Sequence, residues 1–179
     1  MAIIPSDILW TDGQDNDAGL ASELYYAPLA DVATFPAVIA VPTNFDEKVT
    51  VSSDFVMQSG KQFFQIYGTL EKGSVISTLV GERDGKSFEN MAKFVHPGNK
   101  PYLLGFLEYL KNTNLVFIVK ELDGQMRIIG SEDLPAKIDA AESTTGEAVA
   151  DLKHIEITVK SIGRIAPVYT GTVPLTPAP

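Results

Sequence analysis

Hydrophobic and polar positions over residues 101–112 repeat with a helical period. Leu103, Phe106, Leu107 and Leu110 are spaced i, i+3, i+4 and i+7, which places them on one face of a helix. Pro101 suits the first turn, because its missing N–H would have no helical partner there. We therefore expect a helix near 101–112 whose apolar face packs on the rest of the protein.

The period changes to that of a strand after residue 114. Two apolar runs, Leu115–Val119 and Met126–Ile129, flank the turn dipeptide Asp123-Gly124. Asp-Gly tolerates the positive φ angles of tight hairpin turns, so the pattern predicts a β-hairpin closed by a two-residue turn. A helix that leads into a hairpin is thus expected over 101–131.

Further strands are predicted on both sides of this unit. Ile155, Ile157 and Val159 alternate with polar neighbours within 153–160, as in a strand with one buried face. Other runs rich in β-branched and aromatic residues lie at 24–27, 49–53, 62–70, 74–80 and 168–173. The chain therefore has enough strands for a two-layered β structure.

Two stretches carry other signals. Ser87 is a suitable N-cap for a short helix at 88–94, which Pro97-Gly98 would end. Residues 132–151 are polar and are expected to form a loop.

Together these elements predict a mainly β (α+β) fold, an antiparallel β-sandwich or barrel with one main flanking helix. We expect a single domain over 1–179, since no linker or internal repeat divides the chain. Residues 1–48, in which Pro28, Pro36 and Pro42 interrupt the second half, are expected to form an irregular arm or loop with one or two strands. The β core is expected over 49–173, and the proline-rich tail 174–179 is expected to fray.

Composition adds an acidic surface to this picture. The net charge of −9 would repel a nucleic-acid backbone, so we expect no specific nucleic-acid binding. The absence of cysteine excludes thiol catalysis and thiolate zinc sites, and it fits a reducing compartment. The N-terminus does not resemble a signal peptide, and no apolar run is long enough to span a bilayer. We expect a protein made in the cytoplasm, with no membrane partner.

One motif resembles a phosphate-binding loop. Gly81–Ser87 lies between a predicted strand and the predicted helix at 88–94, as a P-loop does. It has three residues between its glycines where the P-loop has four, and the phosphate cradle depends on successive backbone N–H groups. An ordinary turn explains the segment, so we expect no nucleotide site and no cofactor.

The remaining polar candidates do not form a recognisable site. Asp12, Asp15 and Asp17 crowd a short loop, but their spacing does not fit a calcium-binding loop. His96, next to the end of the predicted helix, and His154, on the polar face of a strand, are far apart in the sequence. We expect no catalytic and no metal-binding residues, although triads assemble in space and sequence alone leaves an enzyme open.

Aromatic residues gather in two places along the first half of the chain. They are Tyr25, Tyr26, Phe63, Phe64 and Tyr67. They have no interleaved lysines and arginines, so core packing is favoured over base stacking.

The order of these signals resembles the major tail tube proteins of tailed phages and prophages, which are similar to the tube proteins of contractile secretion systems. The likeness spans most of the chain and consists in the order of the strand, turn and helix signals. The stretches that carry it are Gly19–Pro28, Thr34–Pro36, Phe63–Tyr67, Gly81–Phe88, residues 101–131, Thr145-Gly146, Ile155–Val159 and Pro167–Gly171.

The resemblance implies a non-enzymatic virion protein. Such subunits form hexameric rings that stack into a tube, and strands from each subunit join a continuous inner β-barrel with an acidic lumen through which DNA slides. The implied partners are further copies of the chain and other tail proteins, and the implied final location is the virion. Two alternatives stay open: another phage or surface-binding β module, such as a connector or adhesin-like domain, and an enzyme whose site the sequence does not reveal.

Overall fold

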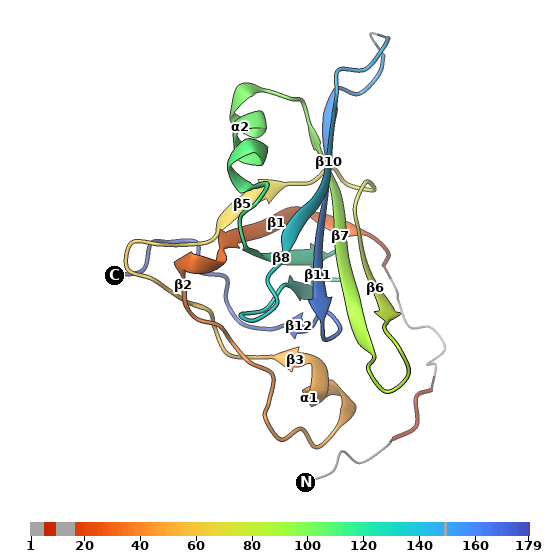
Figure 1. Ribbon diagram of the computed structural model, residues 1–179, viewed down its shortest axis with the longest axis vertical. Coiled ribbons are helices and arrows are strands. Elements are labelled where there is room, and N and C mark those ends of the chain that lie inside the picture. The colour runs from red at the N-terminus through yellow and green to blue at the C-terminus, as the bar shows by residue number, and fades with distance from the viewer. Residues whose placement is uncertain (1–5, 10–16, 149) are drawn as a thin grey trace.

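The fold is mainly β with one main helix, as the sequence predicts (Figure 1). The computed structural model describes residues 6–9, 17–148 and 150–179. The helices are η1 (Leu29–Asp31), α1 (Phe45–Val49) and α2 (Pro101–Leu110). The strands are β1 (Leu20–Pro28), β2 (Val32–Thr34), β3 (Thr50–Val51), β4 (Val56–Met57), β5 (Phe64–Tyr67), β6 (Ser74–Val80), β7 (Ser87–Pro97), β8 (Leu115–Glu121), β9 (Met126–Ile129), β10 (Lys137–Thr144), β11 (His154–Gly163) and β12 (Val168–Tyr169).

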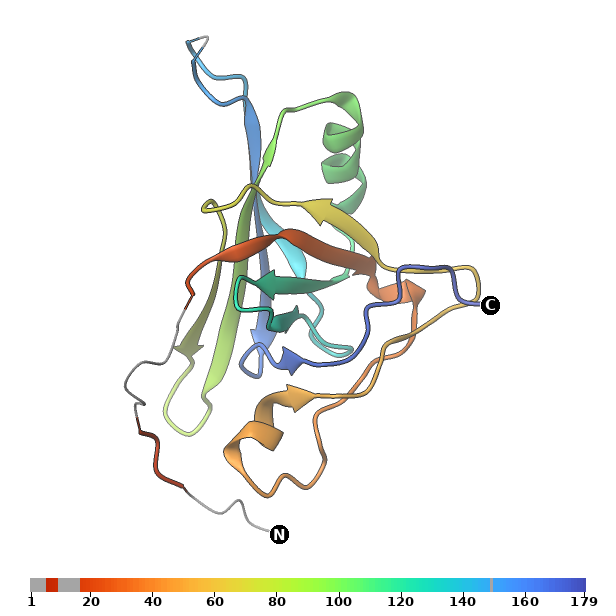
Figure 2. The same cartoon turned by 180° about the vertical axis from the view of Figure 1, so that it is seen from behind.

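Two sheets make up most of the fold. The larger sheet has six strands in the order β3-β12-β9-β8-β1-β5, and the second has four in the order β10-β11-β7-β6. The strands of the four-stranded sheet run along the long axis of the molecule, and those of the larger sheet run across it (Figures 1 and 2). Strands β2 and β4 form a separate pair.

Strand β8 lies inside the larger sheet and is buried on both faces. Leu115, Phe117 and Val119 belong to the apolar cluster between the sheets, whereas Val116 and Ile118 belong to a second cluster on the opposite face. This burial explains why the run is apolar without alternation.

The first cluster is closed by α2. Leu103 and Leu110 are buried, and Phe106 and Leu107 pack against the same cluster while partly exposed. The predicted apolar face of the helix is therefore confirmed. Among the described residues no helix has the length and apolarity needed to cross a membrane.

The second cluster is covered by irregular segments and by the end of the chain. Phe55, Phe63 and Tyr169 pack there with edge-on ring contacts. The tail joins this layer, since the N–H of Gly60 donates to the carbonyl of Ala178 and the N–H of Ala178 donates to the carbonyl of Lys61. The prediction that residues 174–179 fray is wrong, because these main-chain bonds hold the tail.

The predicted helix at 88–94 is wrong, because these residues lie within the eleven-residue strand β7. Phe88, Asn90, Ala92 and Phe94 follow each other at every second position, and the last three are buried. Ser87, taken as a helix cap, is the first residue of the strand.

Residues 132–151 are not one loop, since 137–144 form β10 at the edge of the four-stranded sheet. The predicted hairpin of β8 and β9 is confirmed, but its loop has three residues. Lys120 pairs with Met126, and the N–H of Glu121 donates to the carbonyl of Gln125. Gly124 adopts a φ of 92°, as the last residue of such a loop requires.

The N-terminal region holds two strands, as expected, but one of them is central. Strand β1 lies between β8 and β5 in the larger sheet. The first residues of the predicted arm lie partly outside the described residues. The stretch from 35 to 44 is irregular, in agreement with the prediction for this region.

Candidate assembly surface

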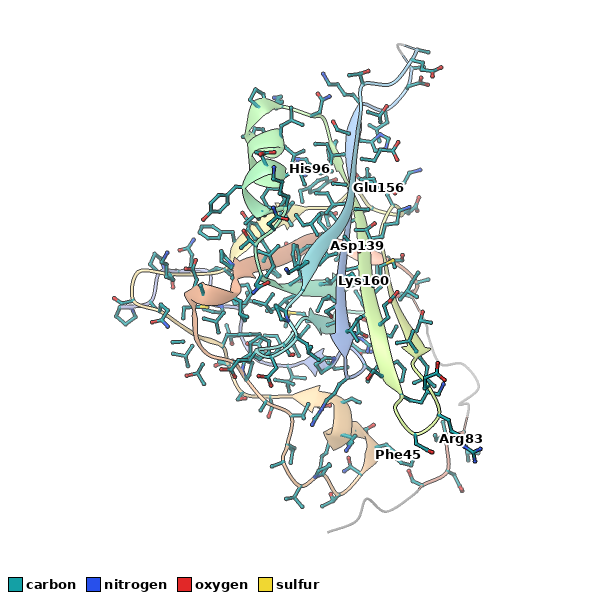
Figure 3. All side chains as sticks on the ribbon, viewed as in Figure 1. Phe45, Arg83, His96, Asp139, Glu156 and Lys160 are labelled. Carbon is teal, nitrogen blue, oxygen red and sulfur yellow. The ribbon has the colours of Figure 1, made fainter. Side chains whose placement is uncertain are left out.

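The outer face of the four-stranded sheet carries alternating charges. Its acidic side chains are Glu89, Asp139, Glu142 and Glu156, and its basic ones are Lys93, Lys137 and Lys160. The labelled Asp139, Glu156 and Lys160 lie over β10 and β11 in Figure 3. This face of the sheet is therefore rich in charged side chains, with the exposed Ile76 and Ile162 beside them, while the opposite face packs on the core.

Two ion pairs join neighbouring strands on this outer face. Lys93 Nζ lies 2.8 Å from Glu156 Oε1, and Lys160 Nζ lies 2.9 Å from Glu89 Oε2. The hydrogen bond with Glu89 raises the pKa of Lys160 above its usual value, and the charges of Glu89 and Asp139 act in the same direction. Because the pairs are exposed, they add little stability, but they leave the face with a small net charge.

Strand β6 is one edge of this sheet and has no charged residue. Its sequence, Ser-Val-Ile-Ser-Thr-Leu-Val, has three β-branched aliphatic residues, a threonine and no proline. Ile76 and Leu79 are 51 % and 56 % exposed. Soluble monomers usually protect a sheet edge with charges, proline or a bulge, and β6 has none of these. Among the described residues no strand pairs with the other edge of β6, so this edge is prone to bind another strand.

Strand β10 is the opposite edge of the same sheet, and it is of a different kind. Its pairing with β11 shifts register between Ile138 and Ala140, as at a β-bulge. Charged residues lie before, within and after the shift, at Lys137, Asp139 and Glu142. Residues 140–144 continue in regular register with β11 and are mostly exposed, so this part offers a usable edge.

The two edges are oriented so that copies of the sheet can be joined in series. Each of the three pairings, β10 with β11, β11 with β7 and β7 with β6, is antiparallel. With four strands, β6 therefore runs opposite to β10. A second copy placed with its β10 beside β6 would continue the antiparallel order without a break.

A concavity lies at the opposite end of the molecule from α2 (Figure 1). It has a volume of about 900 Å³ and lies between residues 35–42 and the body of the protein. Apolar side chains such as Val38, Phe88 and Ile162 line much of it, with Lys48 and Arg164 among the charged ones.

The segment Gly81–Ser87 connects β6 to β7 as the loop of an antiparallel hairpin. A phosphate-binding loop needs a helix after it, and here a strand follows. The ammonium group of Lys86 donates to the carbonyl of Gly81, so it closes the loop on itself. The loop therefore has the geometry of a turn, in agreement with the sequence prediction.

The candidate metal ligands are not all visible. Asp12 and Asp15 lie outside the described residues, and Asp17 is exposed. Within the part of the chain that the structure describes, no group of three or more carboxylate or histidine residues is arranged to hold a metal ion.

The two histidines lie near each other at one end of the four-stranded sheet. His96, on β7, pairs with Ile155, and His154 pairs with Pro97. His96 Nδ1 lies 2.9 Å from the carbonyl of Tyr67, and His154 Nδ1 lies 2.8 Å from that of Leu152. Each imidazole is thus bonded to a main-chain carbonyl. No serine or carboxylate is hydrogen-bonded to either ring among the described residues.

The aromatic residues divide between core and surface. Tyr25 and Phe63 are buried in the second cluster, and Tyr26 packs against Phe106 and Phe117. Burial raises the pKa of both Tyr25 and Tyr26. Phe64 and Tyr67 are 44 % and 47 % exposed on β5, so the core prediction fails for these two.

A comparison of the chain with family models, with curated proteins and with solved structures gives no match. The assembly surface is therefore inferred from the structure of this chain alone. The sequence pattern predicts a strand at 74–80, but it does not indicate that this strand lies at a sheet edge. The lack of charge over 74–80 is the signal that could have drawn attention to it.

Proposed function

We propose that the protein is a structural subunit that joins copies of itself through the edges of its four-stranded sheet, as a phage or prophage tail tube subunit does. The observation that carries the proposal is β6, an exposed edge strand that has no charged residue, proline or bulge of its own and no second strand neighbour among the described residues. Pairing β6 with a neighbouring strand would remove its unpaired backbone groups from water and would cover part of Ile76 and Leu79, which lie on opposite faces of the strand.

The partner of β6 in this proposal is β10 of the next copy. The contact is heterologous, because two different edges meet, so it repeats from copy to copy and closes into a ring when the rotation allows. The bulge near Asp139 limits the pairing to residues 140–144, which fixes the register. A hexamer, as the resemblance implies, would have a closed inner barrel of four strands from each subunit.

The outer face of the sheet would then line the bore of the ring. Its lysines are matched by carboxylates, and the face carries four acidic side chains against three basic ones. A bore with a slight excess of negative charge would not retain a sliding polyanion such as DNA. A connector or adhesin-like β module remains the alternative, and it would not close into rings.

The test is assembly of the intact protein and of one edge variant. Sedimentation and negative-stain electron microscopy at high concentration should show rings or tubes. Ile76→Lys places a charge on the exposed edge and should abolish them, while the circular dichroism spectrum stays unchanged.

Ile162→Lys is the matched control. Ile162 is 49 % exposed, close to the 51 % of Ile76, but it lies on β11 inside the same sheet. The control variant should still assemble. A protein that stays monomeric at all concentrations and salt conditions would contradict the proposal, and so would an Ile76→Lys variant that assembles normally.

A further inference from the structure

The most exposed large apolar side chains of the described residues lie in the N-terminal segment 6–9. Ile8 and Leu9 are 87 % and 81 % exposed, more than any other large apolar side chain that the structure describes. Asp7 precedes them, and residues 1–47 contain no lysine or arginine. The segment therefore offers two uncovered aliphatic side chains next to a carboxylate, in an acidic part of the chain.

The groove of about 900 Å³ has the complementary character. Apolar side chains line much of it, and its charged residues are Lys48, Lys86, Arg164, Glu132 and Asp133. Three basic side chains against two acidic ones make it locally positive, in a chain whose net charge is −9. Among the described residues, Lys48 and Arg164 take part in no ion pair. Such a groove fits an apolar segment that carries a carboxylate.

One wall of the groove makes no main-chain hydrogen bonds with the described residues. Residues 37–40 line this wall, and no main-chain bond to a described residue involves them. The same holds for the main chain of residues 6–9. Two segments with unpaired N–H and carbonyl groups satisfy each other when they lie side by side.

The N-terminal segment does not fill the groove of its own chain. None of residues 6–9 lines that groove. Both lie at the end of the molecule opposite α2, and the segment, red in Figures 1 and 2, lies on the side of β6, beyond the loop that joins β6 to β7. This is the side on which the proposed ring places the next copy. Copies related by rotation about a ring axis have their grooves at the same end of the ring, so the groove of that copy lies at the same end as the segment.

We propose that the N-terminal segment 6–9 of one copy lies in the groove of the copy that pairs with its β6. The occupant of the groove is thus a second copy of this chain. Ile8 and Leu9 pack against the apolar lining, and the carboxylate of Asp7 lies toward Lys48 and Arg164. The inference rests on the proposed function and deepens it, because it names a second contact between neighbouring copies besides the sheet edges.

Disulfide trapping tests this contact directly, because the chain has no cysteine of its own. Ser6→Cys is prepared in one sample and Ala40→Cys in another; both positions are exposed, and Ala40 lines the groove. The two samples are mixed at high concentration and oxidised with oxidised glutathione. The expected result is a disulfide-linked dimer of one variant with the other, identified by mass spectrometry. Its yield should be about tenfold above that from Ser6→Cys with Asn112→Cys, an exposed position just after α2.

Charge reversal makes the test specific to the proposed fit. Adding Asp7→Lys to the Ser6→Cys chain should lower the trapped yield to the control level, and adding Lys48→Glu with Arg164→Glu to the Ala40→Cys chain should restore it. Arg164 accepts the hydrogen bond of Asn90 through its main-chain carbonyl, so replacing its side chain keeps that bond. A yield unchanged by Asp7→Lys would overturn the contact.

The same samples separate this inference from the proposed function. Rings seen by electron microscopy with no excess of trapped dimer would overturn the contact in the groove and leave the proposed function standing. A trapped dimer in a protein that forms no rings would support the contact between two copies and contradict the ring. A chain with both Ser6→Cys and Ala40→Cys that closes an internal disulfide in place of the dimer would mean that the segment fills its own groove, which would also overturn the inference.

Discussion

Strands β8 and β6 look alike in the sequence but differ completely in their surroundings. Leu115–Val119 and Ser74–Val80 are both uncharged and rich in β-branched residues. Strand β8 lies between β1 and β9, and its first five residues are fully buried. Among the described residues, strand β6 pairs with β7 alone, and it exposes Ile76, Thr78 and Leu79.

The comparison shows which neighbours an uncharged apolar strand requires. An uncharged apolar run stabilises a protein when both edges and at least one face are covered, as in β8. Strand β6 has the same kind of sequence without the second neighbour. Part of its apolar surface is therefore not buried in the folded chain. An assembly contact would bury this exposed apolar edge.

The largest effect on the free energy of unfolding is expected in β8, whose neighbouring strands are already in place within the chain. Phe117 is fully buried and contacts the rings of Tyr26 and Phe94. Phe117→Ala should lower the free energy of unfolding by about 3–5 kcal/mol, because it leaves a cavity. Chemical denaturation followed by circular dichroism measures the change.

The matching substitution in β6 should have almost no effect on the isolated protein. Ile76→Ala, measured in the same way at a dilution where the chain is monomeric, should change the free energy of unfolding by less than about 0.5 kcal/mol. A cost near that of Phe117→Ala would mean that β6 is already covered within the chain, and the comparison would fail.

The elements that were predicted correctly are those whose pattern depends on neighbours in the sequence. The i, i+3, i+4, i+7 spacing of Leu103 to Leu110 reports one face of α2, and the alternation of Ile155, Ile157 and Val159 reports one face of β11. Both segments bury one side and expose the other, so their periods are visible.

The errors have equally local causes. In β7 the capping signal of Ser87 outweighed an alternation that includes a polar residue, Asn90. Asn90 is buried because its side chain accepts from the N–H of Ala166 and donates to the carbonyl of Arg164. Strand β10 exposes most of its residues, so it has no apolar period to detect. The candidate surface could not be predicted, because an edge is defined by long-range pairing.

A further prediction identifies the partner of β6. An antiparallel edge could also pair with itself about a two-fold axis, and then β10 would play no part. Ala140 is exposed on β10, in the regular part of the edge. If β6 binds β10, Ala140→Lys should weaken association by about tenfold or more, which corresponds to about 1.4 kcal/mol. Sedimentation equilibrium measures the change. Association that is lost in Ile76→Lys and unchanged in Ala140→Lys would favour the two-fold dimer.

A pH-dependent effect is expected from the far face of β8, where Tyr169 and Ile118 belong to one cluster. Burial raises the pKa of Tyr169 to about 12, and its hydroxyl donates to the carbonyl of Thr172 at 2.7 Å. Because the folded state holds the proton more tightly than the unfolded state, the stabilisation is fully present below pH 10 and is lost as the pH rises from 10 to 12. Tyr25 and Tyr26 act in the same direction.

Tyr169→Phe separates this titration from the loss of the hydrogen bond. The substitution should cost about 1 kcal/mol at neutral pH, where the bond to Thr172 is lost. Above pH 10 the variant should lose stability less steeply than the original protein, because phenylalanine has no proton to release. Urea unfolding at several pH values between 8 and 12 measures both slopes. Equal slopes would mean that the Tyr169 hydroxyl is not held away from water, and that the layer behind β8 is more open than the layer between the sheets.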